Sequence, residues 1–68
     1  MDLCSRLRKI RIERRYSQED IAEVLQSTQQ QYSRYEIGRH EIPVRHVITL
    51  CKFYGISADW LLGLKDEE

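Results

Sequence analysis

Residues 28–36, Thr-Gln-Gln-Gln-Tyr-Ser-Arg-Tyr-Glu, carry the side chains whose types and spacing suggest a specific chemistry. Thr28 is a good helix-capping residue, and it precedes three glutamines and an arginine on what reads as one short helix. An amide side chain can pair with adenine through two hydrogen bonds, and a guanidinium can pair with guanine in the same way. The stretch therefore predicts a helix that reads base edges, if the rest of the chain forms a scaffold for it.

The scaffold is predicted from helical periodicity and capping residues. A first helix spans residues 3 to about 14, because apolar residues recur at helical spacing after an N-cap residue, Asp2. Ser17 caps a second helix, with Asp20 completing a capping box, and this helix ends near residue 25. Thr28 and Gln31 begin a third helix about three residues later. So short a connection is typical of a helix-turn-helix, here at about residues 17–36.

The third helix is expected to have two faces. Tyr32 and Tyr35, three positions apart, are placed toward the interior. The side chains left to point outward are Gln29, Gln30, Ser33 and Arg34. Gln31 is expected to point partly back and to close the capping box.

Two more helices complete the expected fold. Pro43 lies in the first turn of a fourth helix that ends at Gly55. The predicted apolar stripe of this helix is Val44, Val47, Ile48 and Cys51, widened by Leu50 and Tyr54. Ser57 caps a short fifth helix over residues 58–62, and no segment has the pattern of a strand. The predicted fold class is all-α, a compact bundle of five short helices forming a single domain over residues 1–68.

Composition excludes several other classes of protein. The chain has 68 residues, of which 41% are hydrophobic and 32% charged, which fits neither a disordered tail nor a membrane protein. Residues 1–5 contain no apolar signal segment, so we expect a cytoplasmic protein. Cys4 and Cys51 lack zinc-ligand spacing, and no group orients a cysteine–histidine pair with His40 or His46. We therefore predict reduced thiols, no metal, no cofactor and no enzymatic activity.

The charges cancel in total but are unevenly placed. Eleven basic and eleven acidic residues give a net charge of zero. Residues 1–16 carry six basic and two acidic side chains, whereas residues 17–27 carry three acidic side chains and no basic one. Net charge therefore supplies little long-range attraction to DNA, and binding has to depend on where particular groups point. The basic side chains Arg8, Lys9 and Arg14 are expected to make the first helix soluble.

Three sequence elements make a resemblance visible. They are Ser17-Gln18-Glu19, Tyr35-Glu36-Ile37-Gly38-Arg39 and Gly55-Ile56-Ser57-Ala58-Asp59-Trp60-Leu61-Leu62-Gly63. Together with the close helix pair, they resemble the phage repressor/Cro-type (XRE family) helix-turn-helix domain from about residue 5 to residue 64. The resemblance implies a lambda-repressor-like fold that places its third helix in the major groove of double-stranded DNA.

The same resemblance implies roles for particular residues. Gln18 would bind a phosphate, Gln29 and Gln30 would contact bases, and Arg34 would contact guanine or phosphate. The full implied DNA-binding set is Gln18, Thr28, Gln29, Gln30, Ser33, Arg34, Arg39 and Arg45. Arg11 and Glu36 match a structural ion pair between the first helix and the end of the third.

This sequence departs from the family pattern at two places. Gln26 occupies a turn position that is usually glycine, so a positive φ there would cost about 1 kcal/mol. Tyr32 replaces a residue that is usually smaller, and its hydroxyl is expected to reach solvent or a phosphate.

The predicted function is that of a sequence-specific transcriptional regulator, a repressor that binds a pseudo-palindromic operator as a homodimer. The apolar cluster of Trp60, Leu61, Leu62 and Leu64 contains the candidate dimer surface, since about half of it is expected to pack on the core and the rest to remain exposed. The alternative is a protein–protein module on the same fold, such as an antitoxin or a partner-binding regulatory subunit. The neutral net charge and the apolar C-terminal cluster favour that alternative.

Overall fold

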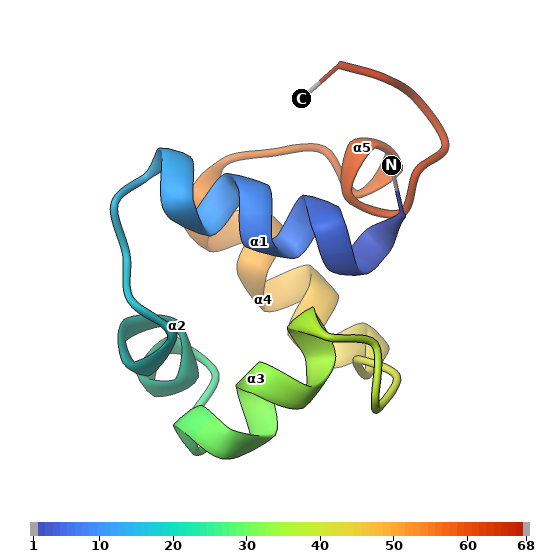
Figure 1. The fold of residues 1–68 in the computed structure, drawn as a ribbon. Helices are drawn as coiled ribbons and strands as arrows, with labels where there is room; N and C mark the ends of the chain where they lie inside the picture. Colours follow the sequence, from blue (N-terminus) through green and yellow to red (C-terminus); the bar gives the residue numbers. More distant parts are fainter. Residues whose placement is uncertain (1, 68) are drawn as a thin grey trace.

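The computed structural model describes residues 2–67, which form five helices and no strand (Figure 1). The helices are α1 (Leu3–Glu13), α2 (Gln18–Val24), α3 (Gln29–Glu36), α4 (Val44–Tyr54) and α5 (Ala58–Leu61). Helices α2 and α3 pack against each other, α1 contacts α3 and α5, and α4 contacts α5. The predicted all-α fold of five helices is confirmed.

The helix starts lie where the capping residues place them. The Asp2 carboxylate accepts a hydrogen bond from the Ser5 N–H at 2.8 Å. Ser17 and Asp20 form a reciprocal capping box, with donor–acceptor distances of 3.0 and 2.8 Å. These bonds satisfy N–H groups that have no partner within their own helix.

Helix α3 is capped differently from the prediction. The Thr28 hydroxyl accepts from the Gln31 N–H at 3.2 Å, but the Gln31 side chain does not reach back to close the box. Its amide instead donates to the Tyr35 hydroxyl at 3.1 Å, one turn further along the helix. Gln31 therefore supports the buried side of α3.

Two residues other than glycine adopt the left-handed backbone conformation. Among residues 2–67 they are Arg15, with φ of 63°, and Gln26, with φ of 54°. Gln26 is the turn position at which the family pattern usually has glycine. Each costs on the order of 1 kcal/mol relative to a glycine. At Gln26 the conformation closes the turn tightly, because the next residue, Ser27, donates its N–H to the Ala22 carbonyl at 2.8 Å.

The core contains residues from all five helices. The largest side chains that are fully buried are Tyr32, Leu7, Ile10, Ile21, Leu50 and Leu61. Tyr32 and Tyr35 both point inward, as predicted. The Tyr32 hydroxyl does not reach solvent, however, because the residue is 0% exposed, and that part of the prediction is wrong.

The buried stripe of α4 is narrower than the predicted stripe. Val44 and Ile48 are exposed, whereas Val47, Leu50 and Tyr54 are buried and Cys51 packs against the core. The exposed and the buried residues both follow helical spacing, so periodicity alone does not predict which of them are buried. Contact with the other helices determines that Val47, Leu50 and Tyr54 face the core. The first turn of α4, with Val44, lies outside the core.

Two arginines of the basic N-terminal segment have structural roles. Arg6 is 7% exposed, and its Nη1 donates to the carbonyls of Trp60 at 2.6 Å and Lys65 at 2.9 Å. Arg14 donates to the Tyr54 carbonyl at 2.8 Å, which corrects its assignment as a solubilising residue. These bonds join α1 to carbonyls at and beyond the C-terminal ends of α4 and α5, where cationic side chains are favourable.

The C-terminal apolar cluster is divided between core and surface. Trp60 and Leu61 are buried, so the prediction that they form part of a dimer surface requires correction. Leu62 is 48% exposed and Leu64 is 73% exposed. Only these two remain available for contact with another molecule.

Replacing Arg6 should destabilise the domain more than replacing its exposed neighbour. We expect Arg6→Ala to lower the free energy of unfolding by about 2 kcal/mol, because it removes the charge-assisted hydrogen bonds to the carbonyls of Trp60 and Lys65. The matched control is Arg8→Ala on the solvent side of the same helix. We expect it to change the free energy of unfolding by less than about 0.5 kcal/mol. Urea titration followed by circular dichroism measures both, and equal losses would contradict the role of Arg6.

Candidate nucleic-acid interface

Helix α3 presents a polar face to solvent. Gln29, Gln30 and Arg34 are exposed, Ser33 is partly exposed, and Tyr32 on the opposite side is buried. Arg34 makes one long contact, from Nη1 to the Gln31 Oε1 at 3.4 Å. Arg34 therefore remains free to reorient toward a ligand.

The C-terminal end of α3 is fixed by a nearly buried ion pair. Glu36, whose side chain is 2% exposed, accepts two hydrogen bonds from Arg11, from Nε at 2.6 Å and from Nη2 at 3.2 Å. Burial alone would raise the pKa of Glu36, but the hydrogen bonds from Arg11 and Gln18 hold it below its ordinary value. The carboxylate is therefore ionised and neutralised by Arg11, and it adds little negative potential to the neighbouring surface.

A chain of hydrogen bonds leads from this ion pair to the start of α3. The Gln18 Nε2 donates to the Glu36 Oε1 at 3.2 Å, and the Gln29 Nε2 donates to the Gln18 Oε1 at 2.9 Å. The order Arg11–Glu36–Gln18–Gln29 thus connects α1, the end of α3, the start of α2 and the start of α3. From the sequence, Arg11 and Glu36 were predicted to form an ion pair and Gln18 and Gln29 to contact DNA, with no link between the two pairs. The one signal for the link is that Gln18 and Gln29 each follow a capping residue, Ser17 and Thr28.

This arrangement leaves a defined bonding capacity on Gln29. The amide uses one of its two N–H groups on Gln18, which leaves the other N–H and the carbonyl oxygen. That remaining pair is the donor–acceptor combination required for bidentate contact with adenine. Gln30 is exposed beside it and is likewise able to offer both groups.

The buried tyrosine hydroxyls near Glu36 are not part of this polar face. No hydrogen-bond partner is present for the hydroxyls of Tyr32 and Tyr54 among the described residues. Burial first, and then the charge of Glu36, raise the pKa of both phenols, so both stay neutral. Each of these two hydroxyl oxygens is a buried polar atom within the core.

Two exposed arginines follow α3 in the chain. Arg39 in the loop after α3 and Arg45 in the first turn of α4 are both exposed. No side chain caps α4, whose N-cap residue is Pro43, so its first N–H groups are available to an anion. Of the two histidines, His40 is exposed in the loop, and the ring of His46 lies 5.9 Å from that of Tyr35. Burial and the nearby Arg45 lower the pKa of His46.

Other kinds of site are not found in residues 2–67. Within that range, no cluster of three or more histidine, cysteine or acidic side chains is able to hold a metal ion. No helix in the same range is long and apolar enough to cross a membrane.

Comparison with known proteins identifies the family. Residues 7–61 match the helix-turn-helix family of the XRE (Cro/C1) type. The chain belongs to this family. The family is not one of enzymes, in agreement with the sequence. The helix-turn-helix match covers all of α2, α3 and α4 and includes every member of the hydrogen-bond chain.

Two relatives of this helix-turn-helix chain come from Bacillus subtilis (strain 168). One is the SPbeta prophage-derived uncharacterized HTH-type transcriptional regulator YonR, 40% identical over 57 residues, covering 84% of this chain and 53% of the relative. The other is the uncharacterized HTH-type transcriptional regulator YobD, 31% identical over 64 residues, covering 94% of this chain and 57% of the relative. The chain therefore spans only about half the length of these relatives.

Removing the Arg11 side chain should destabilise the fold, and this loss is measurable without any ligand. We expect Arg11→Ala to lower the free energy of unfolding by about 3 kcal/mol, because it leaves the Glu36 carboxylate buried without its cation. Thermal unfolding followed by circular dichroism at neutral pH measures the loss. Arg11→Lys, which restores the charge but not the two-bond geometry, should recover part of it. An unchanged melting temperature would show that the pair has no structural role.

Proposed function

We propose that this domain binds double-stranded DNA sequence-specifically and serves as the DNA-binding part of a transcriptional regulator. The observation that carries the proposal is the hydrogen-bond chain Arg11–Glu36–Gln18–Gln29. It holds an amide with a free donor and a free acceptor on the outward face of α3 before any ligand arrives. Pre-organised polar groups lose less entropy on binding, which favours sequence-specific contact.

In the proposed complex, α3 enters the major groove and its outward side chains read the sequence. Gln29 and Gln30 contact adenine through their amides, and Ser33 and Thr28 lie beside them. Arg34 contacts guanine or a phosphate, according to how far the helix is inserted. Tyr32 and Tyr35 stay in the core, so the reading face is the narrow strip that remains.

Phosphate contacts set the position of α3 in the groove. Gln18 keeps one N–H beyond its bond to Glu36, and this N–H is the proposed donor to a phosphate. Arg39, Arg45 and the uncapped N-terminus of α4 supply the contacts on the other flank. With a net charge of zero, these local groups have to provide most of the affinity.

Repression of a pseudo-palindromic operator by a homodimer completes the proposal. Two-fold DNA sites match two-fold proteins, and the exposed Leu62 and Leu64 are the candidate contact. The same exposed leucines favour a second candidate function, a protein–protein module such as an antitoxin or a partner-binding subunit. Titration with duplex DNA at two salt concentrations separates the two functions, because a pure interaction module shows no steep salt dependence.

The first prediction for DNA binding concerns base reading. On an operator selected from random duplexes, we expect Gln30→Ala to cost about 1–3 kcal/mol while leaving binding to unrelated DNA nearly unchanged. Fluorescence anisotropy with both duplexes measures the ratio of affinities. Arg8→Ala is the control, because it removes an exposed side chain of α1 that is outside the proposed DNA-binding set. Equal losses on both duplexes would rule out base reading by Gln30.

The second prediction concerns phosphate contact. Arg39→Ala should weaken binding to specific and unrelated DNA alike and reduce the slope of log affinity against log salt by about one unit. Arg8→Ala, which removes an equally exposed arginine from α1, is the control and should leave the slope unchanged. A slope unaffected by Arg39→Ala would place Arg39 away from the DNA backbone.

A further inference from the structure

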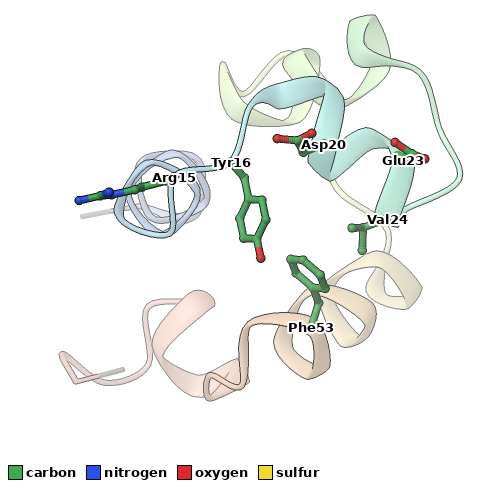
Figure 2. Close-up of a pocket in the computed structure, with 6 residues that line it drawn as sticks. All are labelled: Arg15, Tyr16, Asp20, Glu23, Val24 and Phe53. Atoms are coloured by element: carbon green, nitrogen blue, oxygen red, sulfur yellow. The ribbon is translucent and has the colours of Figure 1, made fainter.

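A surface hollow lies between the α1–α2 connection, α2 and the C-terminal half of α4 (Figure 2). Its volume is about 500 Å³, and it is lined by Arg15, Tyr16, Asp20, Glu23, Val24 and Phe53. The rings of Tyr16 and Phe53 lie 5.2 Å apart, and the two residues are 37% and 41% exposed. Figure 2 shows both rings and Val24 turned toward the same space. The hollow therefore has an apolar wall that solvent reaches.

The charge of this hollow is acidic and incompletely neutralised. Asp20 and Glu23 line its α2 side, against one cation, Arg15. One Asp20 oxygen accepts from the Ser17 N–H in the capping box. Glu23 makes no ion pair or side-chain hydrogen bond with any described residue. An apolar side chain accompanied by a cation is the chemistry that fits this hollow.

The outer face of α1 has the complementary chemistry. A second hollow of about 510 Å³ is lined there by Ser5, Arg8, Lys9, Ile12 and Glu13. Lys9 and Glu13 pair with each other at 2.7 Å, whereas Arg8 has no such partner among the described residues. Ile12 is 46% exposed and lies one helical turn from Arg8 on the same face. The chain thus carries both an acidic aromatic surface and a basic aliphatic one.

We propose that these two surfaces bind each other in different copies of the chain. Ile12 of one copy packs against Tyr16, Val24 and Phe53 of the next, and Arg8 pairs with Glu23. A net charge of zero leaves no long-range repulsion between copies, so the unlike local charges govern their approach.

The proposed contact is heterologous, with different surfaces on the two copies. Each copy keeps one free surface of each kind, so the contact extends to a row of copies and does not stop at a pair. It does not involve Leu62 and Leu64, which form the candidate surface for a symmetric dimer. Arg8 and Glu23 are outside the proposed DNA-binding set, so the contact permits neighbouring copies to occupy adjacent sites on one duplex.

Charge exchange tests the proposal without DNA. Sedimentation velocity of the 68-residue chain, from about 10 μM to 1 mM, should show concentration-dependent association, the range expected of a small interface. Glu23→Arg and Arg8→Glu should each weaken association at least about tenfold, because like charges then meet. An equimolar mixture of the two variants should restore it, because every contact in an alternating row again joins unlike charges.

Glu19→Arg is the matched control, since it makes the same charge change on α2 outside the hollow. It should leave association within about twofold of the unaltered chain, and circular dichroism should show that every variant is folded at the temperature of the measurement. The proposal is overturned if the chain is monomeric throughout, which would leave the acidic hollow to a basic segment of another protein. It is equally overturned if Glu19→Arg weakens association as much as Glu23→Arg, or if the mixed variants fail to associate.

Discussion

The ion pair between Arg11 and Glu36 is the interaction on which both the fold and the candidate interface depend. A carboxylate that is 2% exposed is tolerated only if its charge is balanced and its oxygens are hydrogen-bonded, and Arg11 and Gln18 supply these bonds. Because the three residues come from α1, α2 and α3, the requirement fixes three helices relative to one another. The angle at which α3 is presented to a ligand is therefore set by a buried charge.

This constraint joins stability to recognition in a specific way. Gln18 bonds to Glu36 with its N–H and to Gln29 with its carbonyl, so its orientation is determined by the ion pair. Gln29 in turn is held with its remaining polar groups outward. A change at the ion pair is expected to affect the orientation of the reading face even when the helices themselves remain intact. The effect on stability is measured by the free energy of unfolding. The effect on recognition is measured by the ratio of the affinities for the selected and the unrelated duplex.

Local rules predicted much of this molecule, and long-range packing determined the rest. The caps at Ser17 and Thr28 depend on residues a few positions apart, and the sequence pattern was sufficient to predict them. The positive φ at Gln26 was suggested only by the resemblance to the family, which usually has glycine there. The roles of Arg6 and the stripe of α4 depend on contacts with distant segments. Arg6 meets a carbonyl 54 positions away, and nothing in a basic helix face distinguishes it from Arg8. The link from Gln18 to Gln29 was missed for the same reason.

Because the net charge is zero, the positions of individual charged and polar groups matter more for binding than the total charge. A strongly basic domain gains affinity for DNA from its whole surface, whereas this chain has to rely on a few placed groups. Neutralising Glu36 in the interior removes the negative charge nearest to the reading face. Asp20 and Glu23 of α2 instead line the hollow that contains Tyr16 and Phe53 (Figure 2). The same uneven charge distribution that cancels overall thus separates a face suited to DNA from a face suited to another copy of the chain.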